Sequence, residues 1–339
     1  MNFPFQFLAI AGGAERGIAY CGALYALRSI LNQPLNTVFK GFAGTSIGSA
    51  ISLLIAIGFD PIEIVASWII NPPVWPMDMQ GFIDSGIYNY GSPIGRACIM
   101  SCLDDSIAVD WIANLVSKRI SVVNPTFDEL HQLGFPDIII CVTSMTQQRP
   151  VYYSWKTTPT TPVLFAVRAS MAMAPLIRPQ YDENRGELMV DGGFSDNFPF
   201  ETTFQNPQQT LGLCFLPPAC QRSISRTRIE YLNDIFSLSF YCHQTWRMDY
   251  LLKIVFKNDI EDFCQHIIEL QIEPSTFLRL DIGVSNQVAS SWFEQGWTQL
   301  RLWYDRCKWN KISSPEDNSE HQNDNNDKQN ECTCPPSTT

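Results

Sequence analysis

Short apolar runs alternate with helix-like hydrophobic periodicity through the first two thirds of the chain. The runs that predict buried strands cover residues 5–10, 37–43, 136–142, 187–190 and 210–216. The patterns that predict helices between them cover residues 15–31, 47–57, 109–118 and 163–173. Strands that alternate with helices favour parallel pairing, because each crossover places a helix on a face of the sheet. The pattern therefore predicts a three-layer α/β/α sandwich with a mainly parallel central sheet.

The other segments depart from this alternation. Residues 151–155 are predicted to pair with the strand at 136–142 as a hairpin, or to lie beside it. Residues 71–105 are rich in Pro, Gly and Met, which indicates an irregular cap. Toward the C-terminus the pattern predicts long helices over 225–275, a last strand over 277–282 and a closing helix over 290–305.

Charge divides the chain into two parts. The formal net charge is -11 over 339 residues, but residues 313–339 alone hold six acids and one lysine. That segment is also rich in Asn, Gln, Ser and Pro, a composition that buries too little apolar surface to fold. We therefore expect one folded domain over residues 1–310 and a disordered acidic and polar tail over 311–339. The folded part is only mildly acidic, and nucleic-acid binding is not expected because phosphate affinity depends on clustered Lys and Arg.

Hydrophobic content limits how the chain meets a membrane. The longest apolar stretch, residues 50–59, is about ten residues, and a bilayer-spanning helix needs about 20. Any membrane contact is therefore expected to be peripheral. The 11 cysteines have no repeated spacing, and no positively charged segment precedes an apolar stretch as in a secretory signal. These features favour a cytoplasmic setting, and neither a metal nor another cofactor is expected.

The sharpest chemical signal is a G-x-S-x-G sequence, Gly44-Thr45-Ser46-Ile47-Gly48, which follows a predicted strand and opens a predicted helix. At such an elbow the serine sits on a tight, strained turn, and the flanking glycines remove side chains that would clash with nearby backbone. The free amides and dipole of the helix N-terminus favour developing negative charge. This context favours Ser46 as a nucleophile over a structural turn with an incidental serine.

Two further glycine-rich turns lie at predicted strand ends. Residues 12–17 (GGAERG) follow the first strand, and small residues there let backbone amides approach a ligand, as an oxyanion hole requires. Their spacing fits neither the dinucleotide-binding nor the phosphate-loop motif, and a plain tight turn is the alternative. Asp191-Gly192-Gly193 follow the strand at 187–190, so the Asp191 carboxylate should face a site at the sheet edge. A turn aspartate would produce the same pattern.

The four histidines are His131, His243, His266 and His321, and none stands in a recognisable catalytic setting. His321 lies in the acidic tail, and His131 lies on a polar helix end. A triad in the chain order Ser, acid, His could still use His243 or His266 after the acid. That arrangement remains the alternative to a serine and aspartate acting alone.

Taken in order, the three turns resemble the motifs of the patatin-like phospholipase family: G-G-x-x-R-G, then G-x-S-x-G, then D-G-G. Residues 167–179 (VRASMAMAPLIRP) are similar to the family's Ala-Ser-x-Ala segment with its following prolines. Residues 191–199 (DGGFSDNFP) resemble the D-G-G-x-x-[DN]-N-x-P turn of bacterial-type members. The resemblance covers roughly residues 5–216, and on it the chain is identified as a member of this family.

This resemblance implies a serine lipid acyl hydrolase that uses a Ser–Asp dyad and no metal or other cofactor. Carried over, Ser46 attacks the ester carbonyl, and Asp191 takes its proton and later activates water against the acyl-enzyme. The backbone amides of Gly12, Gly13 and Ala14 would stabilise the oxyanion, by roughly 2.7–4 kcal/mol for each donor. The implied substrate is a fatty acyl ester in a membrane or micelle, contacted peripherally.

The motifs also assign supporting residues and expose one departure. The supporting residues are Arg16, Gly17, Gly44, Gly48, Gly192 and Gly193. Arg16 occupies the family's basic position, where it either steadies the loop or attracts a lipid phosphate. Position 14 is often glycine in the family and is alanine here, so the hole would be imperfect and activity low if this residue required positive φ.

Several activities stay open on the same residues. A lysophospholipase, a neutral-lipid esterase or an acyltransferase would use the same dyad, and pocket shape decides among them. A non-catalytic lipid-binding descendant is the alternative from another class, supported by Ala14 alone. The aromatic side chains of the cap at 71–105 and of residues 236–256 are candidates for contact with a lipid interface, or they pack the core.

Overall fold

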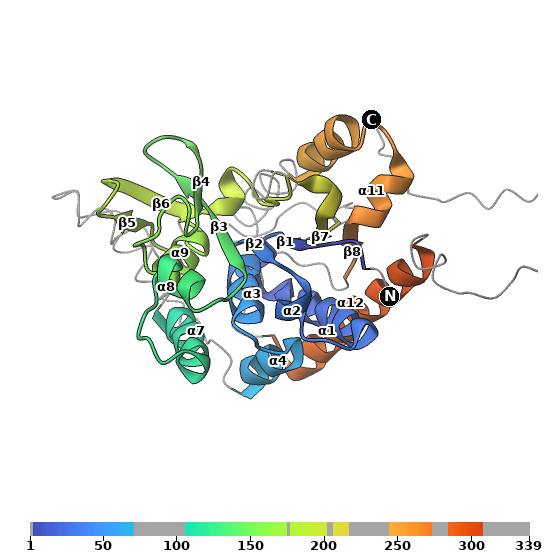
Figure 1. Ribbon diagram of the computed structural model, residues 1–339, viewed down its shortest axis with the longest axis horizontal. Coiled ribbons are helices and arrows are strands. Elements are labelled where there is room, and N and C mark those ends of the chain that lie inside the picture. The colour runs from blue at the N-terminus through green and yellow to red at the C-terminus, as the bar shows by residue number, and fades with distance from the viewer. Residues whose placement is uncertain are drawn as a thin grey trace, which may run out of the picture.

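An eight-stranded sheet in the order β5-β6-β3-β2-β1-β7-β8, with β4 paired to β3, forms the middle layer of the computed structural model (Figure 1). Its strands are β1 (Phe7–Ile10), β2 (Gly41–Thr45), β3 (Asp137–Ser144), β4 (Arg149–Tyr153), β5 (Gln180–Asp182), β6 (Glu187–Asp191), β7 (Thr210–Phe215) and β8 (Ile267–Leu270). The structure describes residues 3–70, 106–174, 177–201, 206–216, 244–272 and 284–307. The predicted cap at 71–105, the strand at 277–282 and the acidic tail lie outside the described residues.

Helices cover both faces of the sheet (Figure 1). The first face carries α1 (Gly17–Leu31), α3 (Ile47–Ala56), α4 (Pro61–Ile70), α7 (Ser106–Arg119), α9 (Val163–Ser170) and α12 (Asn286–Arg306). The second carries α11 (Ile260–His266) and a helix at residues 244–255, whose last turn, Leu251–Val255, is a π-helix. Short α2 (Leu35–Val38) and α8 (Phe127–Gln132) lie in the connections. The predicted α/β/α sandwich is confirmed.

The sheet is mixed, with a parallel centre as predicted and antiparallel strands at one end. Strands β3, β2, β1, β7 and β8 pair in parallel, whereas β4 and β6 both run antiparallel to β3 and β5 runs antiparallel to β6. The connections explain the difference: β3 and β4 are joined by four residues, as are β5 and β6, and antiparallel strands alone can be joined so tightly. The predicted hairpin between β3 and the segment at 151–155 is confirmed.

Three predicted boundaries move. The second strand begins at Gly41 instead of residue 37, because Leu35–Val38 form a helical turn after Pro34, whose carbonyl accepts the Thr37 hydroxyl at 2.7 Å. The helix predicted at 163–173 ends at Ser170, ahead of Pro175, which disfavours helical backbone in the residue before it. The stretch at 225–275 is not helical throughout, because the apolar residues Ile267–Leu270 form β8.

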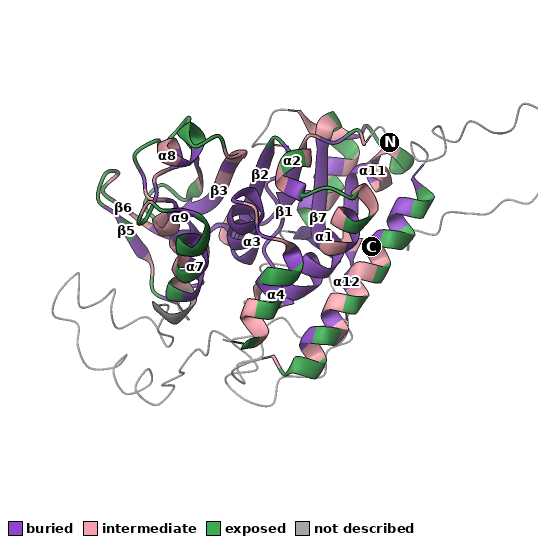
Figure 2. Cartoon of the chain, turned by 60° about the horizontal axis from the view of Figure 1, so that its bottom comes forward, coloured by how far each residue is buried: buried purple, intermediate pink, exposed green. Residues whose placement is uncertain are grey.

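Burial is most complete around α3 and the central strands (Figure 2). Every residue of α3 is buried, in keeping with its almost wholly apolar sequence. The helices α1 and α12 pack so closely that a Cβ on Gly22 would overlap the carbonyl oxygen of Phe293, and a Cβ on Gly296 that of Ala19. The C-terminal helix is therefore part of the same packed unit as β1 and α1.

Candidate active site

Ser46 lies at the junction of β2 and α3 in a strained conformation, with φ 54° and ψ −128°. Such a backbone costs on the order of 1–3 kcal/mol and persists only where the surroundings enforce it. Here the surroundings are two close backbone contacts. A Cβ on Gly44 would overlap the carbonyl of Gly48, and a Cβ on Gly48 would overlap that of Ile10. The flanking glycines therefore let the first turn of α3 sit directly on the strand ends, as predicted for an elbow.

A buried serine holds this turn from the side. The amide of Ser46 donates to Ser170 Oγ at 2.8 Å, and the Ser170 hydroxyl donates to the carbonyl of Cys141 on β3 at 2.6 Å. The main chain of the predicted nucleophile is thus tied to α9 and β3. Ser170 was not among the residues predicted for the site, although it lies in the Ala-Ser-x-Ala segment. That segment was the available signal.

Asp191 lies on the same edge of β3 as the elbow, because β2 and β6 pair in turn with that edge while β4 pairs with the other. It is the last residue of β6 and pairs with Val142, one position beyond Cys141, the partner of Thr45. Because β6 runs antiparallel to β3 and β2 runs parallel to it, the carboxyl ends of β2 and β6 meet head to head at this point. A Cβ on Gly192 would lie 2.9 Å from Thr45 Cγ2, so the Asp191 turn packs against the residue before Ser46.

The carboxyl group of Asp191 is fully buried, and this burial raises its pKa from 3.8 to about 7. A hydrogen bond from the Gly193 amide to Oδ1, at 2.8 Å, and the neighbouring hydroxyl of Ser46 oppose the rise. The other oxygen, Oδ2, accepts no hydrogen bond at normal length within the described part of the chain. The serine and the carboxylate are thus neighbours, and the carboxylate has the proton affinity of a base that works near neutral pH.

The glycine loop lies against the same serine. A Cβ on Gly12 would be 3.2 Å from Ser46 Cβ. The amide of Gly12 already donates to the carbonyl of Asn197 at 3.0 Å, which leaves the amides of Gly13 and Ala14 as the better candidate donors of an oxyanion hole. Ala14 has φ 51°, the left-handed conformation that the sequence analysis identified as unfavourable for alanine.

Arg16 steadies this loop. Its guanidinium is buried, donates from Nε to the carbonyl of Gly13 at 3.2 Å and lies 4.6 Å from the centroid of the Phe215 ring. Tyr20 also stacks on the Phe215 ring, with centroids 4.2 Å apart, and donates to the carbonyl of Gly12 at 3.4 Å. Of the two roles open to Arg16, the structure favours support of the loop over attraction of a lipid phosphate.

The described histidines lie away from Ser46. His266 precedes β8 and contacts the carbonyl of Gln208, which precedes β7, so it lies at the amino edge of the parallel strands. Three strand spacings and four residues of rise separate it from Ser46, about 20 Å. His131 stacks on Trp155 at the start of β3. His243 and His321 lie outside the described residues.

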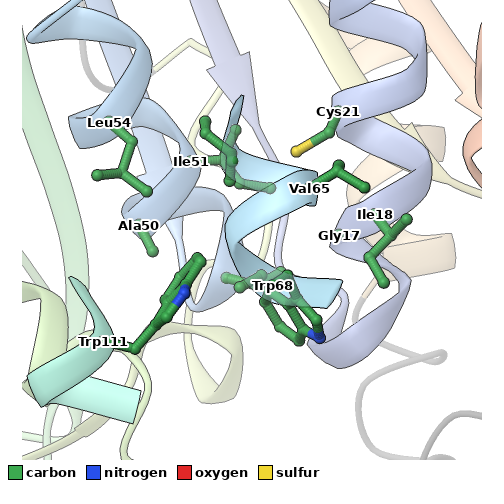
Figure 3. A pocket seen from close by; sticks show the side chains of 11 residues that line it. Gly17, Ile18, Cys21, Ala50, Ile51, Leu54, Val65, Trp68 and Trp111 are labelled. Carbon is green, nitrogen blue, oxygen red and sulfur yellow. The ribbon is translucent and has the colours of Figure 1, made fainter. Parts of the chain in front are cut away.

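An apolar slot begins one residue from Ser46. It lies between α1, α3 and α4 (Figure 3) and encloses about 10 Å³, room for about one water-sized group. Ile47 and Gly17 line it at the site end, and Leu54 lines it deeper along α3. Trp68 and Trp111 meet edge to face at its side, with ring centroids 5.3 Å apart, and Trp111 Nε1 donates to Ser67 at 3.0 Å. The lining is apolar, as contact with a hydrocarbon group would require.

The described residues contain neither a candidate metal site nor a candidate membrane-spanning helix. Their His, Cys, Asp and Glu side chains form no group of three that could hold a metal ion. Nor does this part of the chain contain a helix that is long and apolar enough to cross a membrane.

Known proteins resemble more than half of the chain. A probable lipid hydrolase, 463L, of Invertebrate iridescent virus 6 is 24% identical over 198 residues, or 58% of this chain and 62% of that protein. Lysophospholipase NTE1 of Kluyveromyces lactis is 24% identical over 204 residues, or 57% of this chain and 11% of that protein. The matches therefore span less than two thirds of these relatives' own length.

The fold has a counterpart of known structure. VipD from Legionella pneumophila, solved by crystallography, aligns with a TM-score of 0.55 at 16% identity, covering 90% of this chain and 67% of VipD. The family model described as Patatin-like phospholipase matches residues 8–204, more than half of the chain. That match includes the glycine loop, the elbow and the Asp191 turn, and the chain therefore belongs to the patatin-like phospholipase family.

Proposed function

We propose that the protein is a serine hydrolase of fatty acyl esters in lipids and that it works through Ser46 and Asp191 without a histidine. The observation that carries the proposal is the pairing of a strained serine with a buried neighbouring carboxyl whose pKa is raised to about 7. A carboxylate of ordinary pKa is a weak base for an alcohol, whereas one near neutrality is well matched to proton transfer at physiological pH.

The residues account for each step of an acyl transfer. Ser46 Oγ attacks the ester carbonyl as its proton passes to Asp191, and the amides of Gly13 and Ala14 stabilise the resulting oxyanion. Collapse of this intermediate expels the alcohol, which takes the proton from Asp191. A water molecule then attacks the acyl-enzyme with Asp191 as base, which releases the fatty acid and restores Ser46.

A fluorophosphonate probe tests this proposal directly. Such a probe phosphonylates only an activated serine, so we expect one adduct, located at Ser46 by peptide mass spectrometry. Ser46→Ala should not react, and Ser52→Ala, a change at a buried serine further along α3 that does not contact the Ser46 turn, is the matched control and should still be labelled. Labelling at another serine, or none in folded protein, would favour the non-catalytic alternative.

We propose that the acyl chain enters the slot beside Ser46 by parting its apolar walls, because the space enclosed without substrate is only about 10 Å³. Filling it with Ala50→Leu should lower kcat/KM for long-chain p-nitrophenyl esters about tenfold, because a few methylene groups lose their apolar contacts. Trimming its side with Trp68→Ala should shift the preference toward longer chains. Activity on the acetyl ester serves as the control and should stay the same in both variants. Equal losses on all chain lengths would place the acyl chain elsewhere.

Contact with lipid is proposed to involve the outer side of the helix at residues 244–255. Trp246 and Ile254 are each 60% exposed there, and Tyr250 stacks on Trp246 at 5.7 Å between ring centroids. Amphipathic aromatic rings favour the boundary between water and acyl chains.

We also propose a cytoplasmic setting. The five cysteines among the described residues are free thiols, which supports it, because disulfides are rare in the cytosol.

Ala14 is expected to limit the rate. An alanine at φ 51° costs roughly 1–2 kcal/mol, and its strain acts on an amide of the proposed oxyanion hole. Ala14→Gly should therefore raise kcat, by up to about tenfold if 1.4 kcal/mol of strain is relieved in the transition state. Asn32→Gly is the matched control, because residue 32 has φ 50° at the end of α1 and lies outside the site. An unchanged kcat in Ala14→Gly would mean that the hole is already complete.

We also propose that the hydrolase domain extends to residue 310. The family match ends at residue 204, but the close packing of α12 on α1 supports a hydrolase domain that continues past it.

A further inference from the structure

We propose that the helix at residues 244–255, which lies beyond the family-matched segment, positions the active site through Gln244 and Arg247. The inference rests on the proposed function, because it assigns these residues to the same reaction. The element on which they act is the segment Asp196–Phe198, here called the bridge. It follows the Asp191 turn and is buried throughout.

The bridge connects the two halves of the site through its main chain. The carbonyl of Asp196 accepts the hydroxyl of Thr45, the residue before Ser46, at 2.9 Å. The carbonyl of Asn197 accepts the amide of Gly12 at 3.0 Å. A shift of the bridge would therefore change the distance between the nucleophile and the amides that follow Gly12.

Gln244 fixes the bridge at Asn197. Its Oε1 atom accepts from Asn197 Nδ2 at 2.9 Å, and its Nε2 atom donates to the carbonyl of Phe215, the last residue of β7, at 2.9 Å. Both side chains are more than nine tenths buried. Buried amides require their hydrogen bonds, because unpaired polar groups there are costly. Gln244 thus ties the bridge to the strand that pairs with β1.

Arg247 fixes the bridge at its two ends. Its Nε atom lies 3.7 Å from Asp196 Oδ1 and donates to the carbonyl of Phe198 at 3.4 Å. Its Nη1 atom donates to Glu201 at 3.2 Å. The Asp196 carboxylate also accepts a hydrogen bond from the Tyr152 hydroxyl of β4, at 2.7 Å. One turn of helix separates Gln244 from Arg247, so both point to the bridge from the same side.

These contacts predict an effect on kcat with little effect on KM. In the structure Gln244 and Arg247 contact the bridge and β7 rather than Ser46, so substrate affinity does not depend on them directly. A misplacement of about 1 Å in a catalytic group lowers the rate by as much as 10²-fold. We therefore expect Gln244→Met, which removes both hydrogen bonds at similar volume, to lower kcat about tenfold or more while KM changes less than twofold.

The test uses the full chain and a soluble ester, p-nitrophenyl butyrate, with kcat referred to sites titrated by the fluorophosphonate. Arg247→Met should behave like Gln244→Met, and Arg247→Lys, which keeps a charge near Asp196, should recover part of the rate. A trifluoromethyl ketone, which forms a tetrahedral adduct with the serine, should bind more weakly to Gln244→Met by the same factor. Lys253→Met, an exposed change on the same helix, is the matched control and should keep wild-type kcat.

Two outcomes would overturn the inference. Wild-type kcat per titrated site in Gln244→Met and Arg247→Met would show that the helix only stabilises the fold. A rise in KM with unchanged kcat would place these residues in substrate binding. Both differ from a failure of the proposed function, in which the wild-type protein itself would not react at Ser46.

Discussion

Replacing Asp191 with asparagine is expected to lower kcat for a soluble ester by about 10⁴, the upper end of what a positioned general base contributes. Asparagine keeps the shape of the side chain, and its Oδ1 atom can still accept the Gly193 amide. It cannot take the proton of Ser46, because an amide group is not basic near neutral pH. Steady-state kinetics of the purified variant measure the loss.

The same variant is expected to be more stable than the wild type above pH 7. The folded-state pKa of about 7 lies above the ordinary 3.8, so folding favours the protonated carboxyl. The protonated Asp191 carboxyl makes its full contribution to the free energy of unfolding below about pH 3.8. That contribution is lost as the pH rises from 3.8 through 7. Above that range the buried carboxylate destabilises the fold by on the order of 4 kcal/mol, which a neutral asparagine avoids. Thermal unfolding at pH 8 measures the difference.

Lost activity in a more stable protein separates a missing base from a damaged fold. His266→Ala and His243→Ala are the controls, and both should keep wild-type kcat per folded molecule. If either histidine variant lost its activity with folding intact, a Ser-His-Asp triad would replace the dyad. A near-normal rate in Asp191→Asn would remove Asp191 from the mechanism.

Activity is expected to fall about 50-fold between pH 7 and pH 5, because about half of the base is ionised at a pH equal to its pKa and about 1% two pH units lower. The sign follows from the role: a protonated Asp191 cannot accept the proton of Ser46, and burial sets its pKa at about 7. A carboxylate of ordinary pKa would leave kcat/KM flat over this range. The profile of kcat/KM against pH, measured with a soluble ester, reports the free enzyme.

A second buried carboxyl provides the control for this profile. Burial raises the pKa of Glu269, on the edge strand β8, to about 7 as well. Glu269→Gln should leave the pH profile unchanged, because this strand is three positions from β2 in the sheet. A profile that moved with Glu269→Gln, or one with a midpoint near pH 4, would contradict the assignment to Asp191.

The positions of the three turns could be predicted from the sequence because each depends on residues that local backbone geometry demands. Gly44 and Gly48 leave no room for a Cβ, and Ser46 between them adopts a φ that a strand-to-helix junction imposes. The alternation of strands and helices likewise predicted the layers, because the period of the apolar residues follows from which side each element buries.

The direction of β6 and the partners of the site could not be predicted in this way. An apolar run such as the one ending at Asp191 reads the same in a parallel or an antiparallel strand. Ser170 is 124 residues from Ser46, and Gln244 is 47 residues from Asn197. Hydrogen bonds between such distant residues leave no periodic pattern in the local sequence. For the same reason the sequence did not show that the Gly12 amide donates to the Asn197 carbonyl and is therefore not free for an oxyanion.

The contact between α1 and α12 has a practical consequence for anyone who shortens the chain. Trp292, Leu300 and Trp303 of α12 are buried, so a fragment that stops near residue 216 would uncover the apolar flank of the first helix. Such a fragment would keep every motif residue but would be expected to aggregate, because its exposed apolar surface would associate with other copies. The C-terminal helix, which lies beyond the family match at residues 8–204, is thus a segment that any minimal version of the protein should retain.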